Sequence, residues 1–237
     1  ELLLVSAHRK PPAAAATDSL GRLPASFEGE LPGAGNPVLW HLDLYPDGRF
    51  QLRLTHLGRP EPNRFDDIGR WSRQADSGRI VLRGGREAPV FLMPVDGGAA
   101  LRKLDLRGQP IESAQSDRLQ RLAPFAPIEP RLFLTGLFNV MADAANIVLC
   151  ADRRSVPVAM EADYRALETA YLKASPGPGQ RLLVSLDGLL APRASMEPGP
   201  APRTQLVVER FVSVEPGQRC PAAPSNNSRP EFSNLHK

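Results

Sequence analysis

The sequence has few of the residues that would assign a function directly. It contains two cysteines and four histidines among 237 residues, which leaves little material for a metal centre or a nucleophilic catalytic site. Lysine and arginine exceed aspartate and glutamate by only three, 29 against 26, and they form no cluster interleaved with aromatic residues. We therefore expect no nucleic-acid partner. No apolar run approaches the roughly 20 residues of a membrane-spanning helix.

The motifs of the common enzyme classes are also missing. The chain has no G-x-S-x-G elbow, no H-E-x-x-H, no phosphate-binding loop and no G-x-G-x-x-G. A surface turn explains Asp66 and Asp67, and a strand-end cap explains Asp143, better than acid/base catalysis does. The four methionines are scattered, and core packing accounts for most of them. We predict a protein that is not an enzyme, with no catalytic residue and no cofactor.

Proline and glycine, by contrast, are abundant. The 25 prolines and 19 glycines make up 44 of 237 residues, or 19%, where about 12% is usual. Proline removes a backbone donor and glycine raises the entropic cost of ordering, so long helices are disfavoured. This composition predicts a β-rich protein of short elements.

The prolines also divide the chain. Three of them fall within residues 124–130, which we expect to be a joint between a first domain at 25–123 and a second at 131–220. Residues 1–24 are expected to be a flexible tether and 221–237 a disordered tail. The first domain is expected to be a small barrel or sandwich of short strands, at 26–31, 38–45, 49–56, 68–73, 79–83, 89–95 and 100–105.

The register of one hairpin in the first domain follows from its side chains. A three-residue loop that ends at Gly48 places Trp40, Leu42 and Leu44 opposite Leu54, Leu52 and Phe50. One face of the hairpin is then wholly apolar. The opposite face carries His41, Asp43, Gln51 and Arg53, and we expect it to meet water. His41 would be solvated, and His56 would lie at a strand end on the apolar face beside Val38.

The second domain shows a different order of elements. Strands are expected at 131–140, 146–150 and 156–160, a helix at 161–174, and strands again at 180–190 and 204–214. Tyr164, Leu167, Tyr171 and Ala174 recur at helical spacing, and Glu161 and Asp163 suit the N-terminus of the helix. Three strands, a helix and two strands form the element order of an OB-type barrel.

The two cysteines allow two interpretations. Cys150 and Cys220 are either unrelated packed thiols or a disulfide, which would place the protein in an oxidising compartment such as a periplasm. Cys220 lies in a polar segment where burial of a thiol gains little, so its position favours the disulfide. Closing a loop of about 70 residues would contribute roughly 4 kcal/mol in the loop-entropy model.

Many short segments, taken in order, form a pattern that covers roughly residues 26–220. The segments are Phe27 to Pro32, His41 to Phe50, Gly69 to Trp71, Ile80 to Glu87, Leu101 to Asp105, Gly108 to Ser113, Met141 to Ala145, Pro157 to Ala159, Leu167 to Leu172, and Val207 to Phe211 before Cys220. In this pattern the chain resembles the NlpE-type copper-homeostasis outer-membrane lipoproteins of Gram-negative bacteria.

Membership in this family implies a lipocalin-like small β-barrel followed by an OB-type barrel with one helix. It also implies a disulfide between Cys150 and Cys220, and a periplasmic location with anchoring to the outer membrane through a lipidated N-terminal cysteine that this chain does not contain. The segment before residue 22 would be the tether. Family members commonly carry a C-x-x-C associated with copper in the first domain, but Gly33 and Asn36 occupy those positions and offer no soft ligand for Cu(I).

Three functions remain as hypotheses. The first is an envelope protein that acts in envelope-stress or surface sensing through a protein partner, with its second domain reporting periplasmic oxidation. The second is a lipocalin-like carrier, whose first barrel would hold a small apolar ligand. The third, direct copper buffering, rests only on scattered histidines and methionines.

Overall fold

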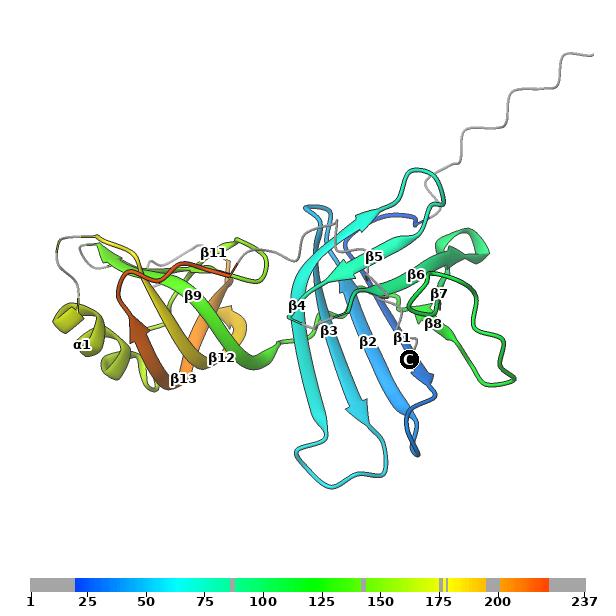
Figure 1. Ribbon diagram of the computed structural model, residues 1–237, viewed down its shortest axis with the longest axis horizontal. Coiled ribbons are helices and arrows are strands. Elements are labelled where there is room, and N and C mark those ends of the chain that lie inside the picture. Colours follow the sequence, from blue (N-terminus) through cyan, green and yellow to red (C-terminus); the bar gives the residue numbers. More distant parts are fainter. Residues whose placement is uncertain are drawn as a thin grey trace, which may run out of the picture.

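The computed structural model describes residues 20–85, 88–141, 144–174, 177, 179–194 and 201–221. Most of the expected tether and tail lie outside these residues. Two β-units lie side by side, joined by the segment between β8 and β9 (Figure 1). Within the described residues no helix is both long and apolar enough to cross a membrane.

The first unit is an eight-stranded antiparallel barrel. Each strand pairs with the next, and β1 also pairs with β8, so the sheet closes on itself and leaves no open edge. The strands are β1 (Ala25–Leu31), β2 (Val38–Leu44), β3 (Arg49–His56), β4 (Arg64–Arg73), β5 (Ile80–Arg83), β6 (Val90–Val95), β7 (Ala100–Lys103) and β8 (Arg118–Arg121), with a 3₁₀ turn η1 (Asp96–Gly98) before β7.

The predicted hairpin register is confirmed. Trp40 pairs with Leu54, Leu42 with Leu52 and Leu44 with Phe50. Gly48 has a φ of 79°, in the left-handed region that a three-residue loop requires at this point. His56 pairs with Val38, as expected. The apolar face of this hairpin therefore forms part of the barrel interior.

The barrel interior is filled by its own side chains. Phe27, Trp40 and Phe50 are buried, and leucines from most of the strands pack with them in one cluster. A carrier needs an internal cavity, and these side chains occupy the space in which a ligand would sit. The filled interior gives the carrier hypothesis no support.

The clearest differences from the sequence-based expectation in the first unit are at β8 and β4. β8 was not among the predicted ranges, because Leu119 is the only apolar residue in Arg118–Arg121 and the segment has no apolar alternation. β4 begins at Arg64 rather than at 68, since Arg64 pairs with Thr55 of β3. Backbone pairing with a neighbouring strand, which leaves no mark in hydropathy, sets both boundaries.

The second unit has the OB-type element order predicted above. Its five-stranded sheet has the order β11-β10-β9-β12-β13, and a parallel bridge between Val158 and Leu206 brings its two edges together. The elements are β9 (Arg131–Met141), β10 (Ala144–Leu149), β11 (Ser155–Pro157), α1 (Tyr164–Ala174), β12 (Leu182–Arg193) and β13 (Arg203–Glu215).

The helix packs its predicted apolar side against the sheet. Tyr164, Leu167 and Tyr171 are buried, and the Tyr171 ring lies edge-on to Phe138 at 5.2 Å between centroids. The helix begins at Tyr164 and not at 161, which corrects the expected start. Ala162 has a φ of 53°, which interrupts a helix, and the Asp163 carboxylate accepts a hydrogen bond from the Phe211 N–H of β13.

Candidate functional site at the domain junction

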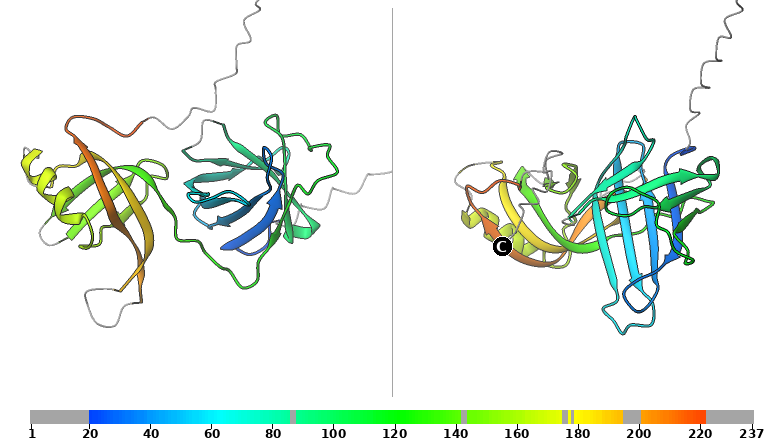
Figure 2. Two further views of the ribbon diagram at one scale, coloured as in Figure 1. Left: turned by 90° about the horizontal axis from the view of Figure 1, so that it is seen from below. Right: turned by 45° about the vertical axis from the view of Figure 1, so that its right-hand side comes forward.

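The segment that joins the two units lies against the outside of the barrel. We call residues 124–130 the strap. After β8 the chain runs along the outer face of β1–β4 before it enters β9 (Figure 2). Ser26 on β1, His41 and Asp43 on β2, Arg53 on β3 and Asp66 on β4 all contact the strap or the residue that follows it.

This arrangement corrects the expectation that the polar face of the hairpin meets water. Asp43 is 0% exposed and Gln51 is 6% exposed, while His41 is half-buried. The strap takes the place of solvent, since its backbone groups satisfy the polar side chains that water would otherwise hydrate. The predicted surface face is an intramolecular interface.

The first part of the strap binds a hydrogen-bonded pair of side chains. Ser26 donates its hydroxyl to Asp43 Oδ1 at 2.6 Å and accepts the Ala126 N–H at 3.2 Å. The other oxygen of Asp43 accepts the Ile128 N–H at 2.8 Å. The buried Asp43 carboxylate therefore binds two backbone N–H groups of the strap, one directly and one through the Ser26 hydroxyl.

The second part of the strap is held by an ion pair. Arg53 donates two hydrogen bonds to the Asp66 carboxylate, at 2.8 and 2.7 Å, and a third to the Glu129 carbonyl at 2.8 Å. Asp66 also accepts the Arg131 N–H at 2.7 Å. The fork of a guanidinium suits such two-point contact, and hydrogen bonding to Asp66 raises the pKa of Arg53.

His41 also contacts the first part of the strap. Its Nδ1 lies 3.1 Å from Glu28 Oε2, and its Nε2 lies 2.9 Å from the Ala126 carbonyl and 3.3 Å from Asp43 Oδ1. Burial acts to lower the pKa of His41. Hydrogen bonds and charge from Asp43, with hydrogen bonds to Glu28 and Ala126, outweigh burial and raise that pKa above 6.5.

The turn at the end of the β2–β3 hairpin meets the start of the strap. The Tyr45 and Phe125 rings are edge-on at 5.8 Å between centroids. Burial raises the pKa of Tyr45 to about 12, and its protonated hydroxyl donates to Gln51 Oε1 at 3.1 Å. This aromatic pair is the side-chain contact that accompanies the backbone contacts.

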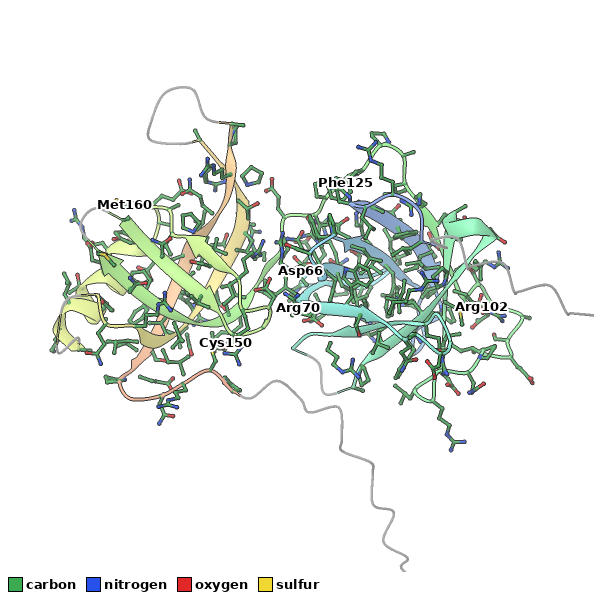
Figure 3. All side chains as sticks on the ribbon, turned by 90° about the horizontal axis from the view of Figure 1, so that it is seen from above. Asp66, Arg70, Arg102, Phe125, Cys150 and Met160 are labelled. Atoms are coloured by element: carbon green, nitrogen blue, oxygen red, sulfur yellow. A yellow bond between two sulfur atoms is a disulfide. The ribbon has the colours of Figure 1, made fainter. Side chains whose placement is uncertain are left out.

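Strand β4 extends the junction toward the second unit. Ile68 is buried and packs with the core of the second unit, beside residues such as Leu134, rather than inside the barrel. Arg70 donates to the Asp47 carbonyl at 2.9 Å within the barrel, and to the Asp152 carbonyl of the second unit at 3.4 Å. Asp66 and Arg70 lie on the side of the barrel turned toward the second unit (Figure 3).

The loop that receives Arg70 begins at the disulfide. The structure joins Cys150 to Cys220, as the resemblance implied, with 5.3 Å between their Cα atoms and a sequence separation of 70. Asp152 lies two residues after Cys150, and Arg153 donates to the Pro221 carbonyl at 3.0 Å. The disulfide therefore ties the last described residues of the chain to a loop that contacts the barrel.

Comparisons with known proteins agree with this two-unit architecture. Residues 27–114 match the NlpE N-terminal domain, and residues 128–221 match the NlpE C-terminal OB domain. The chain is 32% identical over 200 residues to lipoprotein NlpE of Escherichia coli K12, which covers 84% of this chain and 81% of that protein. The chain belongs to the NlpE family. The crystal structure of the Cpx pathway activator NlpE from Escherichia coli also matches, with 29% identity over 84% of this chain and 98% of that chain and a TM-score of 0.36.

The residues of this chain do not fit the C-x-x-C copper site that the NlpE resemblance implies for the first domain. Gly33 and Asn36 lie in the connection between β1 and β2, where Gly33 accepts the Gly35 N–H at 2.9 Å. A Cβ atom at Gly33 would approach the Asn36 carbonyl oxygen to 2.4 Å and Val38 Cγ2 to 2.8 Å. A side chain at Gly33 would require the turn to move, and an Asn36 amide is a hard ligand unsuited to Cu(I).

The histidines of the first barrel do not combine into a metal site. His41 points outward to the strap, whereas His56 stacks edge-on against Phe65 at 5.4 Å between centroids. In the part of the chain that the structure describes, no three side chains of histidine, cysteine, aspartate or glutamate are grouped so as to hold a metal ion.

Sequence reasoning found the side chains of the junction but not their role. It placed His41, Asp43 and Arg53 on one polar face, and it placed the joint at residues 124–130. The missing step was that the joint binds that face, with a sequence separation of 85 between Asp43 and Ile128. The one available signal was a row of polar residues at alternate positions, which an exposed strand shows equally well.

Proposed function

We propose that this NlpE-family protein is a non-enzymatic component of the Gram-negative cell envelope that signals envelope stress by contacting a protein partner. Family membership supports this proposal, together with the description of the Escherichia coli relative as a Cpx pathway activator. An anchor in the outer membrane and exposure to the periplasm belong to the same proposal. A role in copper homeostasis, if retained, would have to use a site other than Gly33 and Asn36.

The position of the disulfide carries a more specific part of the proposal, in which the second unit responds to periplasmic oxidation. Cys150 opens the loop that contacts the barrel through Arg70, so the redox state of this bond acts where the two units meet. The bond restricts the unfolded chain, and its loss would cost up to roughly 4 kcal/mol in the loop-entropy model. The reduced form would open more readily and expose surface that a partner could bind.

The test is amide hydrogen exchange in the oxidised and the reduced protein. We expect reduction to lower hydrogen-exchange protection in β9, β10, β12 and β13. The strands that form the barrel serve as the internal reference. A Cys150→Ser, Cys220→Ser double variant should reproduce the reduced state and no longer respond to reductant. Unchanged protection in residues 131–214 on reduction would refute the redox-sensing part of the proposal.

Partner binding needs a separate measurement. Reporter activation of envelope-stress signalling in cells that express the double cysteine variant, compared with the wild-type chain, tests whether the opened form signals. We expect the variant to be more active than the wild-type protein. Equal activity, with hydrogen exchange changed as expected, would mean that opening of the second unit is not what the partner recognises.

A further inference from the structure

Both ring nitrogens of His41 face groups that only accept hydrogen bonds. Nδ1 faces the Glu28 carboxylate, and Nε2 faces the Ala126 carbonyl, with Asp43 also within 3.3 Å. A neutral imidazole carries a single N–H and can satisfy one of these directions at a time. The imidazolium carries two N–H groups. Only the protonated ring can therefore donate to Glu28 and to Ala126 at once, whereas a neutral ring keeps one of these hydrogen bonds and turns a lone pair toward the other acceptor.

The groups around the ring favour that charged form. Glu28 approaches from β1 and Asp43 lies on β2, two residues from His41. Arg53 is the cross-strand neighbour of His41 on β3, but its charge is directed to Asp66 by a two-point ion pair. Two carboxylates therefore face the imidazole, while the cross-strand Arg53 already has an acidic partner of its own.

We propose that binding of the strap to the barrel depends on pH, because protonated His41 holds the strap more strongly than neutral His41 does. We call this pH-dependent contact the latch. The barrel side of the latch is rigid, because β1 and β2 are paired along their whole length. The strap side is one extended segment, held in this region by backbone groups of Ala126 and Ile128. Loss of the hydrogen bond to the Ala126 carbonyl weakens the hold on the strap near β8, where the Ala126 and Ile128 N–H groups still bind Ser26 and Asp43.

The direction of the pH effect follows from the elevated pKa of His41. A group whose pKa is higher in the folded protein contributes its full stabilisation below its unfolded pKa, near 6.5. The contribution is lost as the pH rises through the folded value. The latch is therefore fastened in mildly acidic medium and loosens on the alkaline side of 6.5.

The latch can be tested in the full chain by NMR between pH 5.5 and 9. The His41 ring resonances report its protonation, and the Ala126 and Ile128 amides report the strap. We expect all three to share one midpoint above 6.5. We also expect protection of the two amides, corrected for intrinsic exchange, to fall roughly tenfold across it.

Three variants separate the latch from other causes. His41→Gln should abolish the pH dependence of the strap amides, whereas His56→Gln, at the other structured histidine of the barrel, should leave it unchanged. Glu28→Gln removes one facing carboxylate without touching the strap, and should lower the midpoint by about half a pH unit or more. It also keeps the test decisive if His41→Gln does not fold.

Two outcomes would overturn the inference. One is a His41 ring that titrates while the Ala126 and Ile128 amides stay protected throughout. The other is a strap transition that keeps its midpoint and amplitude in Glu28→Gln or persists in folded His41→Gln. Neither measurement involves a signalling partner or the disulfide. A negative result would therefore refute the latch without bearing on the proposed function.

Discussion

Gly69 shows how closely the strands of the barrel approach one another. A Cβ atom at this position would lie 2.1 Å from the Arg83 carbonyl oxygen and 2.6 Å from the Gly84 Cα. Both are backbone atoms, so the clash cannot be relieved by turning a side chain. Glycine is required here for space, since the φ of Gly69 is an ordinary one.

We therefore expect Gly69→Ala to destabilise the barrel by about 1–3 kcal/mol, the usual cost of overpacking. Gly85→Ala is the matched control, because its new Cβ would meet only Asp67 Oδ1 at 3.6 Å, an ordinary contact. Its effect should stay within about 0.5 kcal/mol. Denaturation followed by tryptophan fluorescence reports on the barrel alone, since the two tryptophans, Trp40 and Trp71, both lie in it. Equal stability of the two variants would contradict the steric argument.

Individual residues also show which structural features the sequence could predict and which it could not. The alternation of apolar side chains in β2 and β3 determined their register, because only one pairing keeps the apolar residues on one face. The same alternation could not reveal that Asp43 is fully buried. Burial of a polar side chain depends on what covers it, and the cover is a segment 85 residues away.

At the scale of elements, β4 contributes to two cores at once. Ile68 packs into the core of the second unit, whereas Trp71 on the same strand packs against the barrel core. Ile80 on the neighbouring β5 lies inside the barrel, and both isoleucines are almost fully buried. A strand of a closed barrel has one face inside and one outside, so it can line two cores when a second unit covers its outer face.

The two isoleucines give a matched pair of substitutions. Each change to alanine removes a similar buried volume and should cost about 2–5 kcal/mol. Ile80→Ala should lower the denaturation midpoint of the barrel, seen by tryptophan fluorescence. Ile68→Ala should instead lower hydrogen-exchange protection in β9 and β12, across the junction. If Ile68→Ala left β9 fully protected, the contact would be an unimportant one for the second unit.

At the scale of the whole molecule, the strap couples two units that the sequence presents as separate. Three prolines in seven residues predict a joint between two β-rich regions, and no helix or strand is assigned between β8 and β9. They gave no indication that the segment is bound. Its contacts to the barrel are mostly backbone contacts, which any sequence with free N–H groups can make. A composition-based argument therefore identifies such a segment as a linker and misses its binding.

Because the barrel binds the backbone of the strap, we expect two substitutions of Ala126 to have different effects. Ala126→Pro removes the N–H that Ser26 accepts, whereas Ala126→Ser changes the side chain and keeps that N–H. We expect the proline variant to show a larger radius of gyration in small-angle X-ray scattering, because the units separate, and the serine variant to match the wild-type chain. Indistinguishable scattering from all three proteins would show that the remaining contacts hold the junction without this hydrogen bond.

The disulfide also sets how far the molecule can extend under tension. A force applied to the chain before Cys150 and after Cys220 is transmitted through the disulfide, because the Cα atoms of the two cysteines are only 5.3 Å apart. The intervening chain carries no load while the bond is intact. Fully extended, this stretch, with its sequence separation of 70, would span about 240 Å, at roughly 3.3–3.6 Å per residue. Reduction therefore changes the length over which the chain can be drawn out, in addition to its stability.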